Sequence, residues 1–335
     1  MNEWDNELEL SADYFFGRND TERRTTAARE NILPGSRYFT NSDNRSNLLN
    51  DSHRANLRFE VEFDTLTRLS ISPRFNANYG ESYSSRTEES LDENRNLINN
   101  TESRENELLE RENFRNNIDF IKRFGSRGAY LRLGADQNHS IQRNDNFYYS
   151  ESIFFVEGDE VTEIQDQFID EDEKENSYSF DISNRSVLAE DFFLNISYDF
   201  DYSTSANKRY VYESENEDGN YTILNNVLSS DFEVKSFRHT PNLGLNYEGE
   251  IWRINTNIGL LHTKLENENF LEESGFKNTY NNLFLEARLR YEIERSKNLS
   301  FRYGTNINVP SIRQLQPVVD RTNPLNIVVG NPSLE

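Results

Sequence analysis

Apolar and polar residues alternate with a period of two along most of this chain. Between residues 283 and 294 the odd positions are apolar and, after Phe284, the even positions are charged. This alternation is typical of a β-strand with one apolar and one polar face, whereas a helix would spread the charges around its circumference. The same pattern recurs and predicts about eleven strands, with no convincing helix. The expected strands cover roughly residues 7–16, 54–63, 68–84, 113–123, 128–142, 177–183, 192–203, 232–247, 251–265, 280–295 and 299–309.

The connections between these strands alternate in length. Short turns are expected near residues 64–67, 125–128, 184–191, 248–250 and 296–298. Long polar segments, expected to be loops, cover about residues 18–52, 85–112, 144–176, 203–231 and 263–279. A soluble β-sandwich does not require connections that alternate in length, whereas a transmembrane barrel has short turns at one rim and long loops at the other. The predicted fold is therefore an all-β, antiparallel up-and-down meander that crosses a membrane.

Composition supports this interpretation once the two faces are considered. The 335 residues include 59 acidic and 36 basic side chains, for a net charge of −23, and only 34 % are hydrophobic. Such values favour disorder, but 13 % of the residues are aromatic, and a disordered chain would be poor in these. In a barrel only alternate strand positions face lipid, and aromatic side chains form belts at the two interfaces. The candidates for these belts lie near strand ends: Tyr14, Tyr79, Tyr198, Tyr202, Tyr247 and Trp252.

Charge and cysteine content exclude several other classes. The acidic balance argues against a nucleic-acid partner, which would need a basic surface. The absence of cysteine excludes disulfides and any zinc or iron–sulfur site with cysteine ligands. No cofactor is expected.

The polar faces of the predicted strands carry charges that would point into a barrel lumen. They comprise Arg58, Glu60, Arg132, Arg253, Glu286, Arg288 and Arg290. These side chains could line a substrate path, or they could be cross-strand charge pairs on a wet wall. Each of these charged side chains would cost about 2–4 kcal/mol of folding free energy if it faced lipid at the middle of the membrane. The charges therefore predict which face of the sheet contacts water.

Two further groups are candidates for chemistry. Residues 157–175 are strongly acidic, and Asp170, Asp172 and Glu173 could bind a divalent cation or a cationic substrate. A solvated acidic loop is the favoured interpretation, because the EF-hand glycine is missing where Glu175 stands. The four histidines lie far apart in the sequence, near strand–loop borders, and are interpreted as isolated interfacial residues: His53, His139, His239 and His262.

The last 26 residues break the alternation and contain a Pro-Ser, a Gln-Leu-Gln-Pro, an Asn-Pro-Leu and a Gly-Asn-Pro-x-Leu-Glu sequence. This stretch resembles the barrel of TonB-dependent outer-membrane receptors, most closely the outer-membrane β-barrel family common in Bacteroidota. The residues that carry the resemblance are Pro310, Gln314, Leu315, Pro317, Asn323, Pro324, Leu325, Gly330, Asn331, Pro332 and Leu334. The resemblance implies a barrel of about 22 strands, an N-terminal plug and an inner-membrane energy complex. With about eleven strands and no plug, residues 1–335 are expected to be a fragment of such a barrel, with a plug and C-terminal strands missing.

These inferences lead to a first hypothesis, part of a TonB-dependent receptor in the Gram-negative outer membrane that imports a bulky nutrient such as a siderophore, glycan or peptide. The resemblance implies contact with outer-membrane lipid, with the receptor's own plug, with the TonB complex and with a possible surface lipoprotein. The alternatives are a soluble or surface-anchored all-β binding protein and, more remotely, an outer-membrane barrel enzyme. No side chain stands out as catalytic.

Overall fold

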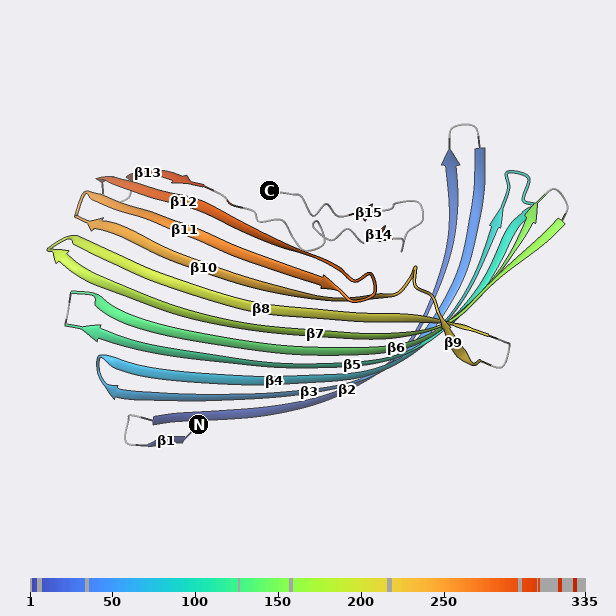
Figure 1. Cartoon of the computed structure of the whole chain (residues 1–335), viewed down its shortest axis with the longest axis horizontal. Coiled ribbons are helices and arrows are strands. Elements are labelled where there is room, and N and C mark those ends of the chain that lie inside the picture. Colours follow the sequence, from blue (N-terminus) through green and yellow to red (C-terminus); the bar gives the residue numbers. More distant parts are fainter. Residues whose placement is uncertain are drawn as a thin grey trace.

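The computed structural model describes residues 2–4, 8–33, 36–125, 127–156, 159–215, 219–294, 297–305, 307, 319–320 and 328–329. Thirteen strands form one large antiparallel sheet (Figure 1). The strands are β1 (Asn2–Trp4), β2 (Leu8–Leu33), β3 (Ser36–Asp64), β4 (Thr67–Leu91), β5 (Leu97–Phe124), β6 (Ala129–Val156), β7 (Asp159–Ala189), β8 (Phe192–Ser214), β9 (Tyr221–Leu224), β10 (Ser230–Glu248), β11 (Trp252–Asn269), β12 (Ser274–Glu294) and β13 (Lys297–Gly304). A separate pair joins β14 (Val319–Asp320) to β15 (Val328–Val329). No helix in the described part of the chain could cross a membrane.

Each strand pairs with its neighbours in sequence, which confirms the predicted up-and-down meander. The order runs from β1 to β8 and on through β10 to β13, while β9 pairs beside β8 alone. Within the described residues β1 and β13 each have one neighbour, so the sheet is open and curved rather than closed (Figure 1). Unpaired sheet edges are a liability that closure with further strands removes.

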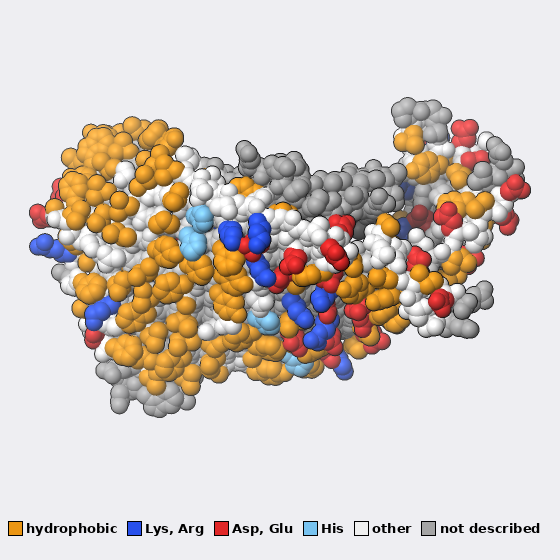
Figure 2. Space-filling view, viewed as in Figure 1, with side chains coloured by type: hydrophobic (Ala, Val, Ile, Leu, Met, Phe, Trp, Pro, Cys, Tyr) orange, Lys and Arg blue, Asp and Glu red, His pale blue; other side chains and the backbone are white. Residues whose placement is uncertain are grey.

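The two faces of the sheet differ as the alternation predicts. On one face, Ile196, Leu243, Ile258 and Leu285 are successive Cα partners across four strands. One residue along each strand, Asn195, Gly244, Asn257 and Glu286 form the corresponding row on the other face. Figure 2 shows the apolar face, with hydrophobic side chains gathered toward the end of the sheet where the short turns lie. We call the two sides the apolar face and the polar face.

The strands are much longer than the alternation predicts. Each of the eleven expected strands lies within one long strand or overlaps it, but the polar segments expected to be loops are mostly strand as well. The expected loop 18–52 contains most of β2 and β3, and the acidic segment 157–175 lies largely in β7. At the other extreme, the strand expected to reach residue 309 ends at Gly304.

The physical reason is that these extensions have water on both faces. At about 3.3 Å per residue, the 31 residues of β7 span roughly 100 Å, whereas about 9–11 residues cross a bilayer. Beyond the membrane neither face is continuously apolar, although aromatic side chains such as Phe147 and Phe168 meet across strands, so the strands carry no regular alternation. They are held by the backbone ladder and by polar cross-strand pairs such as Arg18–Asp51 at 2.7 Å and Arg24–Asp43 at 2.8 Å. Figure 1 shows several of them bending away as arms at the end opposite the short turns.

Candidate functional site on the polar face

Aromatic side chains flank the apolar band at both ends. At the short-turn end, the rings of Trp252 and Tyr291 contact each other in a tilted arrangement with centroids 4.5 Å apart, and Phe192 contacts Tyr247 at 4.8 Å. At the other end, Tyr202 lies 4.7 Å from Phe237 and the rings of Tyr14 and Tyr198 approach histidines. Rings with an apolar body and a polar tip are favoured at membrane interfaces.

The charges predicted to face a lumen all occupy the polar face, because each is an odd number of residues from the apolar positions of its strand. Several are neutralised by neighbours. Arg58 binds Glu60 at 2.5 Å, and Arg68 of the adjacent strand reaches the same carboxylate at 3.6 Å. Arg132 binds Asp119 across β5 and β6 at 2.5 Å. For these residues the structure favours charge pairing on the wall.

The arginines of β11, β12 and β13 are arranged differently. Arg253 is the direct Cα partner of Arg290, and Arg288 is the direct partner of Arg302. None of the four forms an ion pair with an acidic side chain among the described residues. Like charges directly opposite each other destabilise a sheet. Arg253 also has Glu248 as its Cα partner on β10, and all four side chains are exposed, so this arginine quartet forms a positively charged patch that an anionic group could bind.

A hollow of about 370 Å³ adjoins the arginine quartet on the same face. Asparagines from three strands line it, with Glu286 and Arg288 at one side: Asn195, Asn242, Asn246, Asn255 and Asn257. The side-chain oxygen of Asn242 is buried there without a hydrogen-bond partner. Because a primary amide both donates and accepts hydrogen bonds, this surface suits a polar, oxygen-rich solute. The alternation predicts Glu286 and Arg288 on this face, whereas the pattern of charges does not mark the asparagines, because they are neutral.

The three acidic candidates for a cation site do not converge. They lie on the strand β7 rather than in a loop, and alternation puts Asp170 and Asp172 on the face opposite Glu173. Asp170 is the Cα partner of Asp145, and its partial burial together with the charges of Asp145 and Asp172 raises the pKa of its carboxyl. Within the described residues, no group of three or more histidine, aspartate or glutamate side chains is arranged to hold a metal ion.

The sequence suggested four isolated histidines, but two of them meet in the structure. His239 and His262 are direct Cα partners on β10 and β11, with ring centroids 5.8 Å apart. The predicted turn at residues 248–250 would have paired residue 239 with residue 259, whereas the observed register starts from Glu248 opposite Arg253. The motif between residues 310 and 335 cannot be assessed in this way, since its named residues lie outside the described part of the chain.

The fold is similar to the ferric citrate transporter FecA in its unliganded form, at 8 % identity and a TM-score of 0.41, over 88 % of this chain and 44 % of that one. A second similar structure is the FrpB iron transporter from Neisseria meningitidis, at 9 % identity and a TM-score of 0.16, over 89 % of this chain and 68 % of that one. This chain thus spans less than half the length of the ferric citrate transporter. No curated protein sequence matches it. Residues 122–335, nearly two thirds of the chain, match the Outer membrane protein beta-barrel family, and the chain belongs to that family of outer-membrane proteins.

Proposed function

We propose that this chain forms part of the wall of a TonB-dependent outer-membrane transporter that imports a bulky, polar nutrient. The observation that carries the proposal is the open meander with one apolar and one polar face. A sheet of this width that still has free edges needs further strands to close, and a barrel of about 22 strands encloses a lumen large enough for a plug. The soluble alternative is disfavoured by the outer-membrane family and by the continuous apolar band.

The polar face supports a role in import. The asparagine-lined hollow offers many amide donors and acceptors, and the arginine quartet beside it offers exposed guanidinium groups that form no ion pair among the described residues. Arginine binds carboxylate and phosphate groups through its planar fork of donors. The quartet therefore suits either an anionic segment of a plug or a solute that carries carboxylate groups, such as an acidic siderophore, glycan or peptide.

A transport assay tests this proposal. The complete gene that contains this chain is deleted in its host, and uptake is compared after complementation with the wild type and with Arg288→Gln and Arg290→Gln together. The double variant should insert in the outer membrane normally and import the anionic nutrient at least tenfold more slowly, because two of four opposed cations are lost. The matched control is Arg58→Gln, which removes an arginine already paired with Glu60. Uptake that is unaffected by deletion of the gene, or equal loss in the control, would contradict the proposal.

The proposed partners are those of an energy-coupled receptor: a plug domain, the TonB complex and a surface lipoprotein. The arms beyond the membrane give a lipoprotein a large polar surface. Co-purification of the complete protein from mildly solubilised outer membranes would identify such a partner.

A further inference from the structure

The four histidines share one face and one height, although they are far apart in sequence. All occupy apolar-face positions of their strands, in line with the apolar rows that include Val61, Leu133, Leu243 and Ile258. His53 lies 11 residues before Asp64, the last residue of β3, and His139 lies 10 residues after Ala129, the first of β6. His239 lies 9 residues before Glu248, the last of β10, and His262 lies 10 residues after Trp252, the first of β11.

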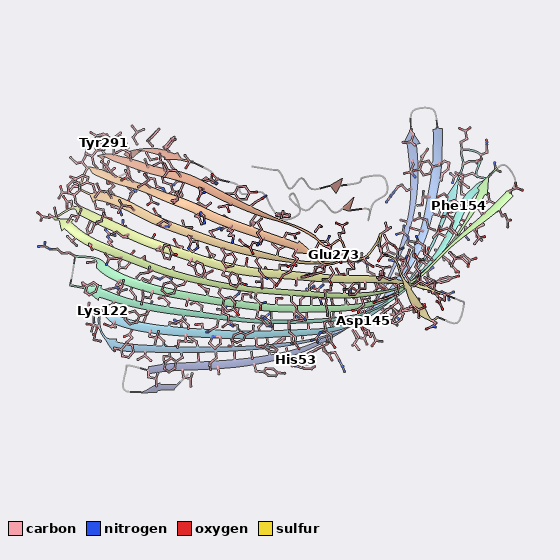
Figure 3. All side chains as sticks on the ribbon, in the orientation of Figure 1. His53, Lys122, Asp145, Phe154, Glu273 and Tyr291 are labelled. Carbon is pink, nitrogen blue, oxygen red and sulfur yellow. The ribbon has the colours of Figure 1, made fainter. Side chains whose placement is uncertain are left out.

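This spacing places the histidines at the outer boundary of the membrane. Nine to eleven residues correspond to about 30–36 Å along a strand, or about 21–30 Å in height at a tilt of 35–45°. The apolar band of an outer-membrane barrel is about 25 Å tall. Figure 2 shows the visible histidines along the border between the hydrophobic band and the charged region, and Figure 3 places His53 between Lys122 at the short-turn end and Phe154 in an arm.

Two of the histidines sit in the same clamp, built twice by unrelated segments. The hydroxyl of Tyr14 lies 2.7 Å from Nδ1 of His53, and the ring of Phe16 lies 5.0 Å from the imidazole at an angle of 45°. In the second copy, the hydroxyl of Tyr198 lies 2.8 Å from Nδ1 of His239, and Phe200 lies 5.0 Å away at 37°. The Tyr–His centroid distance is 6.2 Å in both copies. A Tyr-x-Phe sequence on one strand thus fixes a histidine on the next.

A hydroxyl can donate to Nδ1 or accept from it, and we assign the phenol as the donor in both clamps. A phenol O–H that donates to Nδ1 leaves the proton of the neutral imidazole on Nε2, which becomes a free donor. The other two histidines have amide partners instead. Nδ1 of His262 lies 2.6 Å from the side-chain oxygen of Asn281, and Nδ1 of His139 contacts the side-chain oxygen of Asn176. An amide oxygen can only accept, so there the proton sits on Nδ1 and Nε2 is an acceptor.

Basic side chains follow immediately outside the histidines on the same face. Arg18 lies two residues beyond Phe16, Lys264 two residues beyond His262, and Arg143 and Lys235 four residues beyond His139 and His239. Each has a carboxylate partner, but between 37 % and 59 % of each side chain remains accessible, so donors are left for another anion. Apolar side chains below, donor imidazoles at the border and cations above match the layers of a phospholipid from acyl chain to phosphate.

We propose that the two Tyr-x-Phe/His clamps are binding sites for the phosphate of outer-leaflet lipids, with Nε2–H of His53 and His239 as donors and the nearby cations as support. The clamps then fix the depth of the sheet in the membrane at two points, with the four strands β4 to β7 between them. The proposal depends on membrane insertion of the chain and not on transport.

Solid-state NMR can test this directly with the protein labelled with ¹⁵N-histidine and reconstituted into phosphatidylglycerol and phosphatidylethanolamine bilayers in phosphate-free buffer. We expect ¹⁵Nε2–³¹P dipolar dephasing from His53 and His239, both with the proton on Nε2, and the opposite tautomer for His139 and His262. The single variants His53→Phe and His239→Phe assign the two signals. Tyr14→Phe and Tyr198→Phe keep the aromatic ring but remove the phenol, so they should abolish the tautomer preference and the dephasing together.

Several results would overturn the inference. One is a protein that co-sediments with the bilayers but shows no dephasing. Another is a dephasing signal that appears only after inorganic phosphate is added, which would make the site one for a free anion. Dephasing that persists unchanged in both Tyr→Phe variants would show that the clamp does not position the histidine. Failure of the complete protein that contains this chain to insert would instead refute the membrane placement on which the inference rests.

Discussion

Substitution of Ile258 by arginine tests the assignment of the two faces. Ile258 lies on the apolar face, between Leu243 and Leu285, and six residues from the start of β11. That distance corresponds to about 15 Å of height at the tilt expected for a barrel, close to the middle of the apolar band. An arginine there should cost about 2–4 kcal/mol of folding free energy, or about 30- to 1,000-fold in the ratio of folded to unfolded protein.

The neighbouring residue supplies a matched control. Asn257 lies on the polar face one position away, so Asn257→Arg adds the same side chain to the wet wall and should change stability by less than about 0.5 kcal/mol. His262→Arg, at the outer boundary of the band, should cost about 0–1 kcal/mol, because the penalty falls toward the interfaces. The assay is urea unfolding of the protein in lipid vesicles, followed by tryptophan fluorescence. Equal destabilisation by Ile258→Arg and Asn257→Arg, or a larger effect at Asn257, would refute the assignment of faces.

Three further predictions concern the parts of the sheet outside the membrane. Gly275→Ala should destabilise the hairpin between β11 and β12 by about 1–3 kcal/mol, because the added Cβ would overlap a backbone carbonyl oxygen, and amide exchange at this hairpin should accelerate. Hydrogen bonds from the Asn96 side chain and from backbone amides hold the pKa of the Asp92 carboxyl below its usual value. The turn should therefore be fully stabilised above the ordinary carboxyl pKa and should loosen as the pH falls through the lowered pKa. Amide exchange measured against pH tests this, with Asp92→Ala as a pH-independent reference. The hydrogen bond to Asp231 raises the pKa of the Tyr210 phenol to about 12. The stability that this hydrogen bond contributes should therefore be complete below pH 10 and lost as the pH rises through 12. In Asp231→Asn, an absorbance titration should show the phenol ionising nearer pH 10.

The strand positions within the membrane could be predicted closely from the sequence. The alternation at residues 283–294 marks β12, and the turns near residues 64–67, 125–128 and 248–250 lie where the structure has them. These features are local, since lipid on one side and water on the other impose a period of two on any strand that crosses the band. The polar face was predictable for the same reason, including Glu286 and Arg288 beside the hollow.

The strand extensions could not be predicted in this way. Residues 18–33 and 37–52 have water on both faces, and their pairing depends on the backbone ladder and on partners such as Arg24 and Asp43, 19 positions apart. Such cross-strand partners leave no periodic pattern in the sequence. Their identity as strand rather than loop is decided by the continuation of a hairpin that the membrane part begins.

The sequence by itself determined the class of fold, the two faces and the short-turn rim, because solvent contrast acts on each residue separately. Only the tertiary structure decided which side chains meet across strands: the opposed pair Arg253 and Arg290, the histidine pair on β10 and β11, and the two clamps around His53 and His239. These contacts depend on register, which is set by the alignment of whole strands up to 31 residues long. A shift of one position would leave the local alternation of each strand unchanged and would remove every one of these contacts.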